Sequence, residues 1–129
     1  MFLAKLLKLQ WLYCFLGVVF NMISWLVLAK GGKALTPTAP VSGIVVMVIY
    51  GFFLLAGYFK RISLYRALMG IAILILGYGG IFSHFKLLSQ SPELYHSVWV
   101  GILAISINAF GFTLNSLAAL KRFTLEVAS

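Results

Sequence analysis

The chain has 129 residues, of which 63% are hydrophobic and 9% charged, and ten Lys and Arg against two Asp and Glu give a formal net charge of +8. A soluble domain is usually about 45–50% apolar and about 25% charged, so this composition excludes a soluble fold and a disordered chain. Membrane orientation and contact with anionic headgroups account for the basic charge, which therefore does not call for a nucleic-acid partner. We expect an integral membrane protein.

Four apolar stretches approach the length of about 20 residues that a membrane-spanning helix needs. They cover residues 10–29, 41–59, 64–82 and 97–120. The first follows a basic segment, as in a signal peptide, but it exceeds the about 7–15 apolar residues of such a signal and no cleavage site follows it. We therefore expect an uncleaved span. The predicted fold is all-α, a single four-helix membrane bundle over residues 1–129 with short loops.

Helix-breaking and polar segments separate these spans. Glycines and prolines interrupt residues 30–40, a basic pair occupies positions 60–61, and the sequence SQSPE occupies positions 89–93. Pro92 and Glu93 are residues that the first turn of an incoming helix tolerates. None of these connections is long enough to form a soluble domain.

The distribution of basic residues predicts the orientation in the membrane. On one side lie Lys5, Lys8, Lys60, Arg61, Arg66, Lys121 and Arg122, whereas the other side carries Lys30, Lys33 and Lys86. Because positive residues accumulate on the cytoplasmic side, both termini are predicted to be cytoplasmic, in a bacterial inner membrane. An interfacial aromatic belt is predicted from residues near the span ends: Trp11, Trp25, Trp99, Tyr65 and Tyr95.

Small and polar residues recur at alternating steps of three and four, which keeps them on one helix face. Such faces favour close helix packing inside lipid. In the first span they are Gln10, Cys14, Gly17, Asn21 and Ser24; in the third, Arg66, Gly70, Ile73, Gly77, Gly80 and His84; and in the fourth, Gly101, Ala104, Asn108, Gly111, Asn115 and Ala118. The candidate packing or polar-path residues are Asn21, Ser24, Gly77, Gly80, Asn108, Gly111 and Asn115.

Two asparagines occupy similar predicted depths in antiparallel spans. Asn21 lies in the first span and Asn108 near the middle of the fourth. An unpaired amide is costly in a bilayer, so we expect the two amides to meet near its midplane. A structural staple is the favoured interpretation, and a polar substrate path is the alternative.

The run Gly77-Tyr78-Gly79-Gly80 places three glycines in four residues of the third span. Glycine weakens a helix and allows another backbone, a lipid or a cofactor to approach closely. Gly77 and Gly80 belong to the packing face, whereas Gly79 lies off it. This position predicts a kink or a second contact face.

Few residues are suited to chemistry. No charged residue lies at the centre of a span, and the carboxylates Glu93 and Glu126 are too far apart in the predicted topology to form an acid–base pair. No catalytic residue and no cofactor are predicted, so the chain is not expected to be an enzyme. His84 and His96 flank one outer loop and are candidates for a metal or haem, although interfacial hydrogen bonding is favoured.

The layout of four short spans resembles the small multidrug resistance transporters. The first span of those proteins carries a proton-coupling glutamate, and residues 10–29 contain no acidic residue here. The end of the fourth span, with Asn115 followed by Lys121, Arg122 and Phe123, is similar to GtrA-like proteins. That resemblance implies movement of polyprenyl-linked sugars and is limited to this short segment.

Three functions follow as hypotheses. The favoured one is a non-catalytic accessory or assembly subunit of a larger membrane complex, with a membrane-protein partner. The alternative is a small transporter or lipid-carrier flippase that acts as a homo-oligomer and uses Asn21, Asn108, Thr113 and Asn115. The second alternative is a haem- or quinone-associated electron-transfer subunit with a site near His84 and His96.

Overall fold

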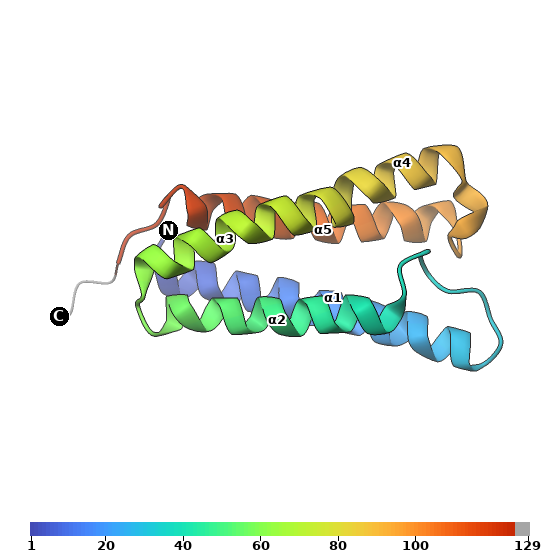
Figure 1. The fold of residues 1–129 in the computed structure, drawn as a ribbon, viewed down its shortest axis with the longest axis horizontal. Helices are drawn as coiled ribbons and strands as arrows, with labels where there is room; N and C mark the ends of the chain where they lie inside the picture. Colours follow the sequence, from blue (N-terminus) through green and yellow to red (C-terminus); the bar gives the residue numbers. More distant parts are fainter. Residues whose placement is uncertain (126–129) are drawn as a thin grey trace.

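A computed structural model describes residues 1–125 (Figure 1), and Glu126 lies outside the described residues. Four helices are long and apolar enough to cross a membrane. They are α1 (Leu3–Ala29), α2 (Pro40–Tyr58), a continuous third helix built from α3 (Ile62–Gly77), the π-helical turn η1 (Tyr78–Phe82) and α4 (Ser83–Gln90), and finally α5 (Val98–Ala119). A short 3₁₀ turn, η2 (Pro92–Leu94), precedes α5. The prediction of an all-helical chain with four such helices is confirmed.

Two helices extend beyond the ranges predicted from hydropathy. The first begins at Leu3 rather than at Gln10, because Lys5 and Lys8 stay exposed while their leucine neighbours are buried. The third does not end at Phe82 but continues to Gln90 through η1. A π-helical turn keeps the backbone hydrogen-bonded where an α-helix is interrupted, so the glycine run changes the helix locally without ending it.

The helices form two antiparallel pairs stacked in two layers (Figure 1). One layer pairs α1 with α2, and the other pairs α3 with α5. The layers meet through α1 with α5 and through α2 with α3. We call the end that carries Met1 and Thr124 the terminal end, and the end that carries the 30–39 loop the loop end. In Figure 1, α4 rises away from α2 towards the loop end.

Backbone hydrogen bonds join the two termini at the terminal end. The Leu3 N–H donates to the Thr124 carbonyl at 2.9 Å, and the Thr124 N–H donates to the Met1 carbonyl at 2.9 Å. The Arg66 Nε–H also donates to the Ala119 carbonyl at 3.0 Å, which ties the start of α3 to the end of α5. Met1 and Thr124 therefore lie on the same side of the bundle.

The buried core is concentrated in the terminal half of the bundle. It draws on the first half of α1, on α2 from its middle onwards, on α3, and on the end of α5 with the segment after it: Leu3, Leu6, Leu7, Tyr13, Cys14, Met47, Tyr50, Leu54, Ala56, Tyr65, Met69, Ala72, Leu114, Ala118 and Phe123. The predicted aromatic belt needs correction here. Tyr65 and Tyr95 are 0% and 1% exposed, since their hydroxyl groups find buried partners, whereas Trp11, Trp25 and Trp99 are exposed.

Candidate functional site

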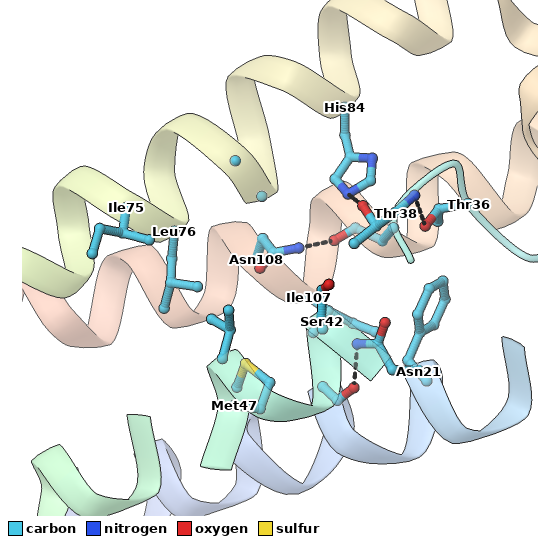
Figure 2. Close-up of a pocket in the computed structure, with 17 residues that line it drawn as sticks. Asn21, Thr36, Thr38, Ser42, Met47, Ile75, Leu76, His84, Ile107 and Asn108 are labelled. Carbon is cyan, nitrogen blue, oxygen red and sulfur yellow. Dashed lines mark hydrogen bonds between the residues drawn. The ribbon is translucent and has the colours of Figure 1, made fainter. Parts of the chain in front are cut away.

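A cavity of about 270 Å³ lies between the helix layers, on the loop-end side of the core (Figure 2). All four spans and the 30–39 loop contribute to its walls. Its polar lining residues are Asn21, Thr36, Thr38, Ser42, His84 and Asn108. Thr38 and Ser42 are exposed, so the cavity opens to the surface beside them. This cavity is the candidate site.

Glycines form the parts of the wall where the two asparagine amides lie. A Cβ atom added to Gly43 would overlap the Asn21 amide, and one added to Gly80 would lie 2.6 Å from the Asn108 Cγ. Gly79 also lines the cavity, and no heavy atom lies within 4 Å of the position its Cβ would take. The glycine run of the third span therefore serves both close packing, at Gly80, and open space, at Gly79.

The two asparagines line the same cavity but do not pair with each other. The Asn21 Nδ2 donates to the Gly17 carbonyl at 2.8 Å, and the Asn108 Nδ2 donates to the Ala104 carbonyl at 2.9 Å (Figure 2). No hydrogen bond joins the two amides in the described part of the chain. The predicted direct contact is thus replaced by bonds within each helix. A helix carbonyl one turn away satisfies an amide without bringing the helices together, which leaves space between them.

His84 points from α4 towards the cavity and is held on both sides (Figure 2). Its Nδ1 lies 2.7 Å from the Tyr95 Oη, and its Nε2 lies 3.5 Å from the Thr38 Oγ1. The Tyr95 hydroxyl also donates to the His84 carbonyl at 3.2 Å. Burial raises the pKa of the Tyr95 phenol, so Tyr95 is a neutral hydrogen-bonding partner at physiological pH.

Ser24 and His96 hold the loop that covers the cavity. The Leu35 N–H donates to the buried Ser24 Oγ at 3.0 Å, and the His96 N–H donates to the Leu35 carbonyl at 3.1 Å. The His96 Nδ1 also lies 3.2 Å from the Lys33 carbonyl oxygen. These contacts bring Thr36 to the cavity wall. Ser24, expected on a helix-packing face, thus contacts a loop.

The two histidines therefore have separate partners. His84 contacts Tyr95 and Thr38, whereas His96 contacts Lys33 in the covering loop. Among residues 1–125, no group of three or more His, Cys, Asp or Glu side chains is placed to hold a metal ion. Hydrogen bonding accounts for the position of both rings.

A second polar cluster lies in the terminal half, and it is fully buried. The Tyr65 hydroxyl donates to the Gln10 Oε1, and the Gln10 Nε2 donates to the Asn115 Oδ1 at 3.1 Å. The Tyr50 hydroxyl donates to the same Asn115 oxygen at 2.6 Å. One residue comes from each of the four spans. We call Gln10, Tyr50, Tyr65 and Asn115 the buried network. The Asn115 Nδ2 has no hydrogen-bond partner within the described residues.

Tyr13 connects the buried network with the cavity. Its hydroxyl donates to the Asn108 Oδ1 at 3.1 Å, and its ring packs edge-on against Tyr50 with the ring centroids 5.3 Å apart. A Cβ atom added to Gly111 would overlap the Tyr13 ring. A Cβ atom added to Gly77 would lie 3.3 Å from the Phe112 ring, which is tighter than an ordinary contact. These glycines therefore make room for aromatic rings.

The sequence analysis identified the amides of the site but missed several of its hydroxyl groups. Thr36, Thr38 and Ser42 lie in or beside a segment that was interpreted only as a helix break. Tyr95 was assigned to the membrane interface. The signal that could have identified these residues is the density of hydroxyl groups between positions 36 and 42, next to an apolar span.

No protein-family model matches this chain, and the comparisons with curated proteins and with solved structures found no significant match.

Proposed function

We propose that the chain is a small membrane transporter or lipid-carrier flippase whose cavity accepts a neutral group rich in hydroxyl or amide functions. The supporting observation is the cavity of about 270 Å³, with polar side chains from several helices inside an otherwise apolar bundle. Pockets for small molecules usually span about 300–1,000 Å³, so this cavity is slightly smaller than that range. Its size favours a compact polar head over a whole amphiphile.

The chemistry of the lining supports a neutral ligand. The residues that form the cavity wall include no Asp, Glu, Lys or Arg. A charged ligand would lack a counter-charge there, and burying an unpaired charge is costly. The Ser42 hydroxyl makes no hydrogen bond within residues 1–125, and each asparagine amide has a second N–H to donate. These groups suit the hydroxyl groups of a sugar-like head.

We place this activity in a bacterial inner membrane, with the terminal end on the cytoplasmic side. The seven basic residues of the terminal end against three of the loop end support this orientation. In this orientation the cavity lies between the buried core and the outer face of the membrane. A homo-oligomer is part of the proposal, because so small a bundle has little room for a complete pathway across the membrane.

The test is lipid movement in proteoliposomes that contain fluorescent glucosylceramide, a lipid with a neutral sugar head. Dithionite quenches only the fluorophores that it reaches in the outer leaflet. We expect the protein to make the inner-leaflet fluorophores accessible and Ser42→Ala to slow this step. Ser106→Ala is the matched control, since that hydroxyl is exposed and donates to its own helix. Equal quenching in liposomes with and without protein would contradict the proposal.

An accessory or assembly subunit is the second candidate, and one observation favours it. At Gly70, in the middle of α3, no heavy atom lies within 4 Å of the position a Cβ would take. The neighbouring Ile71 and Leu74 are exposed, so this part of α3 has room for a partner helix. Purification in mild detergent, followed by mass spectrometry, tests the accessory-subunit function. Partner proteins that remain bound in stoichiometric amounts after a salt wash would support it. A protein that purifies alone or as a homodimer would exclude it. Neither candidate function includes catalysis by this chain.

A further inference from the structure

We propose that the chain holds an anionic phospholipid in a second groove, between α1 and α2 at the terminal end. This groove encloses about 370 Å³. It is separate from the cavity of the candidate site, and the two share no lining residue. The inference is therefore independent of the proposed function.

The groove combines apolar walls with two cationic side chains. Leu3, Leu7 and Trp11 of α1 lie along one side, and Tyr58 and the helix end lie along the other. Lys8 and Lys60 are exposed and belong to the same lining. Apolar walls suit a segment of acyl chain, and two ammonium groups suit the phosphate above it.

Lys60 occupies a backbone position where glycine is normally preferred. Its φ is 57°, and the Arg61 N–H donates to the Ala56 carbonyl at 2.8 Å, as in a Schellman helix end. A side chain in this left-handed conformation has an energetic cost that glycine avoids. Lys121 has the same conformation outside the groove, so what distinguishes Lys60 is that its side chain belongs to the groove lining.

The charge around the groove suits an anion. Seven basic residues belong to the terminal end, and Glu93, the one carboxylate within residues 1–125, lies in η2 at the loop end. Trp11 and Tyr58 are both exposed beside the groove, and these residue types favour the level of the lipid headgroups. A phospholipid with a net negative head fits this combination of charge, aromatic rings and apolar walls.

Tryptophan quenching provides the test, because Trp11 lines the groove. Trp25→Phe and Trp99→Phe leave Trp11 as the single tryptophan. The protein is reconstituted into vesicles with brominated phosphatidylglycerol or brominated phosphatidylcholine, both of which quench a tryptophan they contact. The quantity measured is the ratio of the two lipid association constants at Trp11.

We expect phosphatidylglycerol to be favoured by about fivefold for each groove lysine, and Lys8→Gln with Lys60→Gly to bring the ratio close to unity. The matched control is Lys5→Gln with Lys121→Gly. It removes the same charge from the same end, and Lys121 also has a left-handed φ, of 55°, but neither residue lines the groove. The control pair should keep most of the preference.

Two outcomes would overturn the inference. Equal quenching by the two lipids in the parent protein would show that the groove does not select an anionic head. An equal loss of preference in the groove pair and the control pair would show that general surface charge, and not the groove, attracts the lipid. Replacing lysine by glycine at a left-handed position favours the folded backbone, so unfolding is not expected to obscure the result.

Discussion

The two halves of the bundle use the same kinds of polar residue in different ways. In the terminal half, tyrosine hydroxyls meet the amides of Gln10 and Asn115, and the centre of the bundle between the two helix layers is filled. In the loop half, Asn21 and Asn108 donate to their own helices and a cavity remains. Similar side chains thus give a solid core in one half and a candidate binding site in the other.

The residues that face the amides explain the difference. In the terminal half, the Tyr50 and Tyr65 hydroxyls donate to Asn115 and Gln10. In the loop half, Gly43 packs against Asn21 and Gly80 against Asn108, although the Asn108 oxygen also accepts from the Tyr13 hydroxyl at the border between the halves. A tyrosine supplies both volume and a hydrogen-bond partner, and glycine supplies neither. Divergence of α4 from α2 adds to the space (Figure 1). A polar residue in a membrane helix therefore becomes structural or ligand-facing according to what lies opposite.

The largest loss of stability should come from adding a methyl group in the half where the core is filled. Gly111→Ala places a Cβ against the buried Tyr13 ring and should destabilise the fold by about 1–3 kcal/mol, because overpacking displaces the ring. Gly79→Ala is the matched change in the open half, where no atom lies within 4 Å. Unfolding in mixed detergent micelles measures both. Equal destabilisation by the two changes would break the distinction between a filled half and an open half.

Replacing one amide in each half should separate their roles. Gln10→Met conserves the shape but leaves the Tyr65 hydroxyl without its buried acceptor and removes one of the two donors to the Asn115 Oδ1, so it should cost about 1–2 kcal/mol. Asn21→Leu removes a bond made within one helix and should cost less than Gln10→Met in the same micelle assay. If Asn21→Leu lowers the free energy of unfolding more than Gln10→Met does, the proposed difference between the two halves is wrong.

Removing the Ser24 hydroxyl should loosen the wall of the cavity without affecting the buried network. Ser24→Ala removes the acceptor of the Leu35 N–H, and the lost hydrogen bond should cost about 1 kcal/mol. Hydrogen exchange of the Leu35 amide should become faster, while the amides of the terminal half keep their protection. Unchanged exchange at Leu35 would mean that Ser24 does not hold the loop.

The smallest losses of stability should come from removing single hydroxyl groups. Tyr50→Phe removes one of the two donors to the Asn115 Oδ1, so it should cost about 0.5–1 kcal/mol. Ser42→Ala, in the open half, removes a hydroxyl that is exposed and should change stability by less than about 0.5 kcal/mol. Comparable losses for both variants in micelle unfolding would argue that Ser42 has a structural role.

Hydropathy and residue type alone determined the number of helices, their approximate positions and the place where one is irregular. These properties depend on local sequence, because every backbone polar group in a membrane span is satisfied within its own helix. The run at residues 77–80 predicted a kink or a second contact face, and the structure has a π-helical turn there, since three glycines weaken an α-helix wherever it packs.

Only the tertiary structure decided which polar groups meet. Asn21 and Asn108 have similar depths, yet the helix layers separate between them, and Tyr65 and Tyr95 are buried although they lie near helix ends. Such outcomes depend on how helices diverge and on which side chain faces which, and residues far apart in the chain determine both. The cavity, its hydroxyl groups and the second groove are consequences of that arrangement.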